Sequence, residues 1–226
     1  MNKKVLHIAV DGPGGSGKGT LCVELAKKLK ILYIYTGGMY RALALASLRA
    51  GINVNNNEEV QKLFKNSSIE LKSMDSDTRV FLDGEDVSDE IFLPKVALVV
   101  PVIAAFPEIR KEMVKRQKEL IKGKNAVIEG RDITTVIAPD ADLKIYLTAD
   151  VKIRAKRRHE QFLKRGINKS FEDVLTDTQE RDKKDTEREA SPLSVAKDAV
   201  IIDTTNDSIE NTVEKVMNIL KKRDLV

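Results

Sequence analysis

The sequence Gly12-Pro13-Gly14-Gly15-Ser16-Gly17-Lys18-Gly19-Thr20 contains the spacing G-x-x-x-x-G-K near the start of the chain. Glycines at these positions let several backbone N–H groups converge on phosphate oxygens. A helix that begins here directs its positive N-terminal end at the same negative charge, and Lys18 can reach the β- and γ-phosphates of a nucleoside triphosphate. We therefore predict that residues 12–20 form a phosphate-binding loop.

The segments on both sides of this loop have the patterns that such a loop requires. Residues 5–10 are a nearly continuous apolar run, which is typical of a strand buried on both faces of a parallel sheet. Apolar residues at helical spacing follow the loop, namely Leu21, Cys22, Leu25, Ala26 and Leu29. The order of strand, loop and helix is the context in which this motif binds phosphate.

Strand-like and helical segments alternate along much of the chain. We expect further strands at residues 31–35, 126–129, 143–147 and 199–203, a helix at residues 39–50, and a final helix that Ser208 caps. Because such alternation brings parallel strands together with helices on their faces, it predicts an α/β fold with a mostly parallel sheet.

Two stretches break this alternation. Residues 69–87 hold two short apolar runs, split by Asp75-Ser76-Asp77 and followed by the turn signal Asp83-Gly84, and predict a small inserted antiparallel unit. Residues 151–192 are highly charged and helical in pattern, with an interruption at Gly166 and a capping box that begins at Ser170. Because this second stretch has few apolar anchors, we expect it to be a mobile lid.

The composition argues against several classes of protein. Aromatic residues make up 4% of the 226 residues and Trp is absent, which argues against a stacking platform for single-stranded nucleic acid. No apolar run approaches the ~20 residues of a membrane span, and the single Cys22 suits a reducing compartment. No sustained heptad or uncovered apolar stripe is evident. We expect a cytoplasmic monomer that binds neither nucleic acid nor membranes.

Arginine is the residue type that phosphoryl transfer between two nucleotides needs most. The loose transition state requires charge neutralisation and positioning, and the planar guanidinium grips phosphate oxygens in pairs. The arginines that lie beside an expected element end or within the expected lid are Arg41, Arg110, Arg131, Arg157, Arg181 and Arg188. A basic run such as residues 154–169 can also be a solvated helix face, so these arginines are candidates only in combination with other features.

The spacing of Arg181, Asp185 and Arg188 places these side chains on one face of a helix. Surface ion pairing alone would explain that spacing, and an ordinary turn would explain Gly130-Arg131-Asp132. However, Gly12, Thr36 and Gly130 all fall at the carboxyl ends of expected strands, where open α/β sheets bind their ligands. The coincidence of these features at one sheet edge favours a binding site.

The chain resembles the bacterial cytidylate kinases over nearly its whole length. The matching segments are Asp11-Gly12-Pro13 through Gly17-Lys18-Gly19-Thr20, Thr36-Gly37-Gly38-Met39-Tyr40-Arg41, Ala104-Ala105-Phe106-Pro107 with Arg110, Gly130-Arg131-Asp132, Arg181-Asp182 with Asp185 and Arg188, and Ser191-Pro192-Leu193. The resemblance implies Mg²⁺-dependent transfer of the γ-phosphoryl group of ATP to CMP or dCMP, which gives ADP and CDP or dCDP.

The resemblance also implies an architecture. We expect a P-loop NTPase-type core with a five-stranded parallel sheet, formed by residues 1–62, 101–150 and 191–226. Residues 63–100 would form an inserted monophosphate-binding domain, and residues 151–190 would form the lid.

By the same likeness, the expected site residues fall into groups. Residues 12–20 would bind ATP, with Lys18 and Arg157 neutralising the transferring phosphoryl group. Arg41, Arg131 and Arg188 would hold the acceptor phosphate, so that Arg131 and Arg188 act in catalysis. Asp185 and Arg181 would meet the ribose. The pyrimidine would be framed by Thr36, Arg110, Asp132 and Arg188.

The metal ligand is a separate question, because Gly19 follows Lys18 where most P-loop proteins place Ser or Thr. The G-K-G-T ending resembles nucleoside-monophosphate kinases, which hold their metal largely through water and phosphate oxygens. Thr20 is the best candidate for a protein contact to Mg²⁺, and the metal itself is inferred from the reaction rather than from a ligand cluster.

Three positions depart from the family pattern. Tyr35 and Glu129 each stand where Asp is usual, and the second change puts a contact to metal-bound water in doubt. Pro101 stands where a Ser usually helps to hold the base, and it should break a continuous helix because it lacks an N–H.

Two other functions compete with this interpretation. A shikimate- or gluconate-type kinase would share the phosphate loop but needs no inserted sheet. A nucleotide-binding regulator or a nucleic-acid-binding protein would use the basic stretch, against which the scarcity of aromatic residues argues.

Overall fold

The computed structural model describes residues 5–74 and 77–226, and its centre is a sheet of five parallel strands. These strands are β1 (His7–Asp11), β2 (Leu32–Tyr35), β6 (Ala126–Gly130), β7 (Leu143–Thr148) and β8 (Val200–Asp203), in the order β2-β6-β1-β7-β8. Strand β1 pairs with β6 on one side and β7 on the other. The sheet confirms the expected α/β class and the expected number of core strands.

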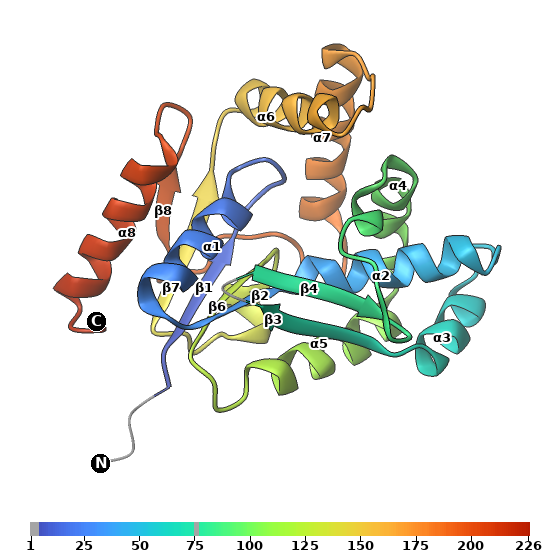
Figure 1. The fold of residues 1–226 in the computed structure, drawn as a ribbon, viewed down its shortest axis with the longest axis horizontal. Coiled ribbons are helices and arrows are strands. Elements are labelled where there is room, and N and C mark those ends of the chain that lie inside the picture. The colour runs from blue at the N-terminus through green and yellow to red at the C-terminus, as the bar shows by residue number, and fades with distance from the viewer. Residues whose placement is uncertain (1–4, 75–76) are drawn as a thin grey trace.

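Helices cover both faces of this sheet (Figure 1). On one face α1 (Lys18–Leu29) and α8 (Ile209–Lys222) pack against alternate strand residues such as Ile8 and Val10. On the other face α5 (Pro107–Ile121) and the short π-helix η2 (Ile133–Ile137) cover Ala9. Because both faces are covered, β1 is apolar at successive positions, as its sequence predicted. Cys22 is fully buried in the first of these two layers.

A second sheet contains three antiparallel strands, β3 (Ile69–Met74), β4 (Asp77–Leu82) and β5 (Glu85–Asp86). Asp83 and Gly84, which join β4 to β5, both have positive φ values of 50° and 87°. A two-residue turn with positive φ at both positions is the type I′ hairpin that Asp-Gly favours. This unit confirms the predicted insertion, although residues 75 and 76 of the expected break lie outside the described residues.

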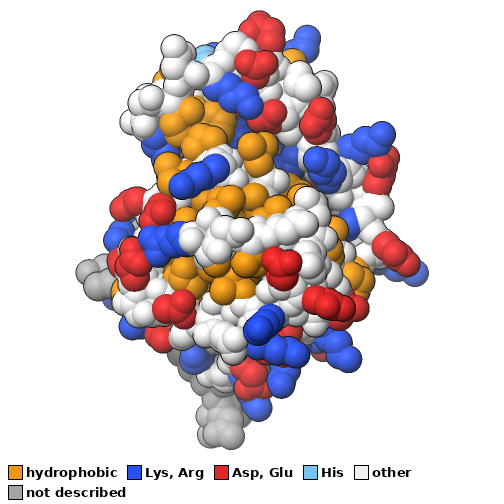
Figure 2. Space-filling model, turned by 90° about the vertical axis from the view of Figure 1, so that its right-hand side faces the viewer, with side chains coloured by type: hydrophobic (Ala, Val, Ile, Leu, Met, Phe, Trp, Pro, Cys, Tyr) orange, Lys and Arg blue, Asp and Glu red, His pale blue; other side chains and the backbone are white. Residues whose placement is uncertain are grey.

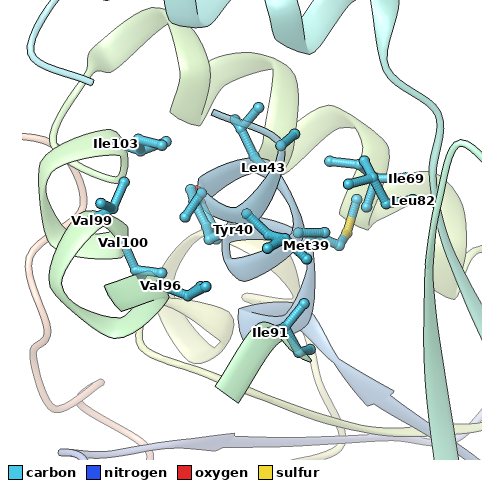
Figure 3. Packing of buried hydrophobic residues seen from close by; sticks show 14 of the residues in the cluster. Met39, Tyr40, Leu43, Ile69, Leu82, Ile91, Val96, Val99, Val100 and Ile103 are labelled. Carbon is cyan, nitrogen blue, oxygen red and sulfur yellow. The ribbon is translucent and has the colours of Figure 1, made fainter. Parts of the chain in front are cut away.

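The second sheet packs on a helical layer whose core differs from that of the main sheet. This layer consists of α2 (Thr36–Arg49), α3 (Asn57–Asn66), the 3₁₀ turn η1 (Glu90–Phe92) and α4 (Pro94–Ile103). Figure 3 shows Met39, Tyr40 and Leu43 of α2 at the centre of this core, between Val96, Val99, Val100 and Ile103 of α4 on one side and Ile69 and Leu82 on the other. Helices α3, α4 and α5 were not predicted from the sequence.

Two sequence predictions about helix limits were wrong. Helix α2 begins at Thr36, directly after β2, so that Gly37 and Gly38 lie in its first turn rather than in a loop. Helix α4 runs through Pro101 to Ile103. Proline removes one helical hydrogen bond, but burial of Val99, Val100 and Ile103 against α2 supplies tertiary stabilisation that outweighs this loss.

Helices α6 (Val151–Lys164) and α7 (Phe171–Glu187) stand above the carboxyl ends of β1 and β7 (Figure 1). They are separated at Gly166, which has a φ of 70°, and the side chain of Ser170 accepts the N–H of Asp173, as the capping box predicted. Their contact with each other includes a small separate cluster, Ala155, Phe162 and Val174, with Ile167, Phe171 and Leu175 around it. A helix pair with so small an apolar core of its own is consistent with the expected lid.

The expected division into domains stays a prediction. Two of the expected boundaries, after residues 62 and 100, fall inside α3 and α4. The boundaries after residues 150 and 190 fall at or next to helix ends, around the α6–α7 pair.

Within residues 5–74 and 77–226, no helix has the length and hydropathy of a membrane span. Figure 2 shows the face at the right of Figure 1, where Lys, Arg, Asp and Glu side chains intermingle around a hydrophobic centre. A surface of mixed sign on this face differs from the single-sign patch that nucleic-acid binding favours.

Candidate active site

The phosphate loop turns tightly because two of its glycines lie where a side chain has no room. Gly12 has a φ of 148°, and a Cβ atom built on it would lie 2.0 Å from the carbonyl oxygen of Leu147. Gly15 has a φ of 80°, and its Cβ would lie 2.7 Å from the carbonyl oxygen of Arg154. These close approaches, to the end of β7 and to the first turn of α6, fix the loop at the carboxyl edge of the sheet.

Lys18, the first residue of α1, folds back over the loop. Its Nζ donates hydrogen bonds to the carbonyl oxygens of Gly12 and Pro13, both at 2.8 Å. Burial, and then the neighbouring charge of Arg131, lower the pKa of Lys18 to about 7. A cation held in this way gains most from a ligand that brings negative charge.

A cavity of about 570 Å³ extends from this loop to α2, α4 and α7. Sixteen of the residues predicted for the site line it: Gly14, Gly15, Ser16, Gly17, Lys18, Gly19, Thr20, Thr36, Arg41, Arg110, Arg131, Asp132, Arg157, Arg181, Asp185 and Arg188. The two that do not are Gly12 and Pro13, which lie at the base of the loop and accept the hydrogen bonds of Lys18.

The middle of the cavity holds more guanidinium groups than carboxylates. Arg131 Nε donates to Asp185 Oδ2 at 2.8 Å, and Arg181 Nε lies 3.9 Å from the same oxygen. Burial, followed by Arg131 and Arg41, lowers the pKa of Arg181 to about 9. Burial opposes ionisation of Asp185, yet Arg131 and Arg181 together hold its pKa below the usual value. This excess of buried positive charge would be relieved by phosphate.

Unpaired donors in the same region point to a missing ligand. The Nε of Arg181 and the Nη2 of Arg188 are buried, and neither has a hydrogen-bond partner among the described residues. Buried donors without partners are rare in folded proteins, and a bound anion is one explanation for them.

The far end of the cavity contains a buried pair of opposite charges. Arg110 Nη2 donates to Asp132 Oδ2 at 2.5 Å, and Arg110 Nη1 donates to the carbonyl oxygen of Ala104 at 3.1 Å. The guanidinium lies 5.6 Å from the centre of the Tyr40 ring. Both the Nε of Arg110 and the hydroxyl of Tyr40 are buried without partners in the described part of the chain. This end therefore offers an oriented guanidinium, a carboxylate and unused polar atoms.

Thr36 lies at the floor of the cavity, where its hydroxyl donates to the carbonyl oxygen of Glu129 at 2.6 Å. That bond joins the first residue of α2 to strand β6, one residue before Gly130. The Thr36 oxygen keeps its capacity to accept a hydrogen bond from a ligand.

Arg157 and its neighbour Arg158 diverge. Arg157 donates to the carbonyl oxygen of Thr204 at 2.7 Å and to its hydroxyl at 3.0 Å, at the end of β8. Arg158 instead interacts with the charges of Arg41 and Arg131. Burial is the largest cause of its lowered pKa, and these two arginines lower that pKa further. Both line the cavity, and the sequence had singled out only Arg157.

Sequence reasoning missed three further residues that hold the site together. Buried Asp11 accepts hydrogen bonds from the backbone N–H groups of Ile133 and Thr134, at 2.9 and 2.7 Å. Arg154 pairs with Asp182 at 2.6 Å and donates to the carbonyl oxygen of Gly14 at 3.2 Å. Thr204 donates to the carbonyl oxygen of Ser16 at 3.1 Å. Asp11 and Thr204 stand at or just after strand ends, which is the signal that identified Gly130.

The residues near the loop fit a metal ion that is held mainly by phosphate and water. Within the described residues no group of three His, Cys, Asp or Glu side chains could hold a metal. Glu129 Oε2 is buried and has no hydrogen-bond partner among residues 5–74 and 77–226, and a Cβ built on Gly19 would lie 3.5 Å from it. Burial raises the pKa of Glu129. Thr20 is exposed and lines the cavity.

Comparison with known proteins identifies the family. The sequence profile of the family "Cytidylate kinase" matches residues 8–222. Over 220 residues, the chain is 42% identical to a cytidylate kinase of Bacillus cereus (strain ATCC 10987 / NRS 248) and 42% identical to one of Bacillus thuringiensis (strain Al Hakam). Each alignment covers 97% of this chain and 97% of the relative.

Solved structures resemble the chain in fold at much lower identity. An uncharacterized protein from Eubacterium ventriosum ATCC 27560 has a TM-score of 0.53 at 13% identity, over 97% of this chain and 99% of that one. A sugar kinase from Janibacter sp. HTCC2649 has a TM-score of 0.51 at 13% identity, over 96% of this chain and 95% of that one. The chain thus belongs to the cytidylate kinase family, a family of nucleoside-monophosphate kinases that use ATP.

Proposed function

We propose that this protein transfers the γ-phosphoryl group of ATP to CMP or dCMP and releases ADP with CDP or dCDP. The observation that carries the proposal is the buried Arg110–Asp132 pair, which lines the same cavity as the phosphate loop. A phosphate loop alone would serve many kinases, whereas an oriented carboxylate and guanidinium at the far end suit a polar base.

The donor end would bind the triphosphate of ATP. Residues 14–19 line the cavity, and their backbone N–H groups would bind the phosphate oxygens. Lys18 would leave the carbonyl oxygens of Gly12 and Pro13 to contact the β- and γ-phosphates. Mg²⁺ bound to these phosphates would neutralise the charge that develops on them. Glu129 and Thr20 are the residues that would hold the metal, through water or directly.

The acceptor phosphate would lie among Arg41, Arg131 and Arg188, and the ribose would lie near Asp185 and Arg181. Because the acceptor atom is an oxygen of a phosphate dianion, the reaction needs no strong general base. The arginines would offset the repulsion between the two anionic substrates and stabilise the charge on the phosphoryl group during its transfer.

Cytosine would fit the far end by hydrogen-bond complementarity. Its N4 amino group donates, which suits the Asp132 carboxylate, and its N3 and O2 accept, which suits Arg110 and Arg188. Uracil presents an acceptor at O4 and a donor at N3. Its O4 would therefore face the Asp132 carboxylate, which only accepts, and its N3–H would face the Arg110 guanidinium, which only donates.

Helices α6 and α7 would act as a lid that phosphates draw closed. Arg154 ties the first turn of α6 to the loop, so we expect motion in the segment beyond it. Hydrogen exchange in residues 158–180 should slow when a bisubstrate nucleotide binds, and equal exchange with and without that ligand would argue against a lid.

The decisive experiment measures ADP production with a panel of acceptors: CMP, dCMP, UMP, AMP, shikimate and gluconate. We expect turnover with CMP and dCMP, and kcat/KM for CMP above that for UMP by at least about thirtyfold. Preference for an acid or a sugar would refute the proposal. We also propose that the protein acts as a monomer, which sedimentation in the same buffer would test.

A further inference from the structure

Tyr35 occupies the cavity at a position that the proposed reaction does not yet use. It is the last residue of β2 and directly precedes α2. Its half-buried side chain lines the cavity. Cβ atoms built on Gly37 and Gly38 would lie 3.0 and 2.9 Å from its ring, so the ring lies across the first turn of α2. The two glycines leave the room that this large side chain needs.

The orientation of the ring is fixed from its other side. Tyr35 stacks on Phe92 with the ring planes 5° apart and the centroids 6.0 Å apart. The guanidinium groups of Arg41 and Arg165 lie 5.1 and 4.4 Å from the centre of the same Phe92 ring. Arg165 comes from the end of α6, so this aromatic pair lies where the lid meets the acceptor side.

The charges of Arg131 and Arg158 interact with Tyr35. Burial lowers the pKa of Arg131, but Asp185 raises it, and the net shift is upward. Tyr35 adds to this increase. Burial is the main cause of the lowered pKa of Arg158, and Tyr35 acts in the opposite direction by raising that pKa. Tyr35 lines the same cavity as both arginines and as the phosphate loop.

Among the described residues the Tyr35 hydroxyl makes no side-chain hydrogen bond, and its half-buried side chain is open to the cavity. The guanidinium groups around it only donate, so they offer no acceptor for its O–H. A phosphate oxygen that enters the cavity can accept this hydrogen bond in place of water.

We propose that the Tyr35 hydroxyl is a further substrate-binding group, which donates a hydrogen bond to a phosphate oxygen between the donor and acceptor nucleotides. The inference rests on the proposed phosphoryl transfer. A hydroxyl group is an uncharged donor, so it adds a hydrogen bond to those of the arginines without adding charge. An Asp at this position, as in the family pattern, would instead bring negative charge.

The test is Tyr35→Phe, which keeps the ring and its stacking on Phe92 and removes only the hydroxyl. Affinity is measured for P1-(5′-adenosyl)-P5-(5′-cytidyl) pentaphosphate, which carries phosphates, and for cytidine, which carries none. We expect the affinity for the pentaphosphate to fall about tenfold, as for the loss of a hydrogen bond to a charged group. Cytidine, measured as a competitor of CMP, should bind as before, and kcat/KM for CMP should fall with the pentaphosphate affinity.

Tyr146→Phe is the matched control, because that tyrosine does not line the cavity, and it should leave both affinities unchanged. Unchanged pentaphosphate affinity in Tyr35→Phe would overturn the inference. An equal loss for cytidine and pentaphosphate, or a lower Tm, would also overturn it, because the hydroxyl would then be structural. Turnover of CMP by the unsubstituted protein tests the proposed function separately.

Discussion

The two ends of the cavity are built in different ways. The donor end consists of nine consecutive residues, 12–20, whose backbone is bent by its own glycines and whose single cation, Lys18, bonds to the loop itself. The base end consists of side chains far apart in the sequence, such as Arg110 and Asp132, which meet because α5 and β6 bring them together. Local sequence therefore specifies the first end, and only the tertiary fold assembles the second.

The ends also differ in how they hold charge without ligand. In the described part of the chain, Lys18 has no carboxylate at hydrogen-bond distance, and its pKa is lowered, so phosphate is needed to stabilise its protonated form. Arg110 is already paired with a carboxylate and fixed by the carbonyl oxygen of Ala104. The donor end should therefore respond strongly to pH and phosphate, whereas the base end should respond to changes in its hydrogen-bond pattern.

The largest expected effect is at the donor end. Lys18→Ala should lower kcat by about a hundredfold or more, because removal of one electrostatic contact to the transition state costs ~3 kcal/mol. Lys27→Ala is the control, since Lys27 lies on the same helix, is exposed and pairs with Glu24. Turnover close to normal in Lys18→Ala, with an unchanged circular dichroism spectrum in both variants, would contradict the role of the loop.

The next effect is at the base end and concerns selectivity. Asp132→Asn keeps the shape but turns one acceptor into a donor, so kcat/KM for CMP should fall about thirtyfold relative to that for UMP. Loss of the buried carboxylate also weakens the pairing of Arg110 and should lower Tm. The ratio of the two kcat/KM values does not depend on how much protein is folded. A ratio that stays unchanged would mean that Asp132 does not read the base.

Proton uptake distinguishes the two ends further. The pKa of Lys18 is about 7 without ligand, and phosphate should raise it, so binding of ADP above pH 7 takes up a proton. The affinity for ADP should therefore fall as pH rises, by about fivefold between pH 7 and 8. Calorimetry in two buffers of different ionisation enthalpy measures the uptake. Lys18→Ala should abolish it, and uptake that persists in this variant would assign the proton to another group.

The same contrast explains what the sequence could predict. The strand at β1, the loop and α1 follow from local pattern and spacing, and the structure confirms them. The start of α2 was misplaced because Gly37 and Gly38 look like loop residues, whereas here they accommodate the ring of Tyr35. Helix α4 was missed because Pro101 argues against a helix, and only the packing of its apolar face shows otherwise.

Prediction of the site was limited in the same way. The arginines were selected by their places beside expected element ends or within the expected lid, but their individual roles came from resemblance to a family, since nothing in the local sequence shows that Arg110 faces Asp132. Arg158 was missed because Arg157 beside it is chemically identical, and the direction of each side chain depends on how α6 lies against β8. Asp11 was missed because its partners, Ile133 and Thr134, are more than a hundred residues away.

The smallest expected effect tests the departure at Pro101, which lines the cavity within α4. Because the helix continues on both sides of Pro101, Ser fits the same backbone, and its N–H can restore a bond to the carbonyl of Ala97. Its hydroxyl would add one neutral hydrogen bond to cytosine, typically ~0.5–1.5 kcal/mol, so Pro101→Ser should widen the CMP to UMP ratio of kcat/KM by about threefold. Pro101→Ala restores the N–H without the hydroxyl and should leave the ratio unchanged. Equal ratios in the two variants would show that the hydroxyl bonds back to its own helix, as Ser side chains often do, and that the base end gains nothing at this position.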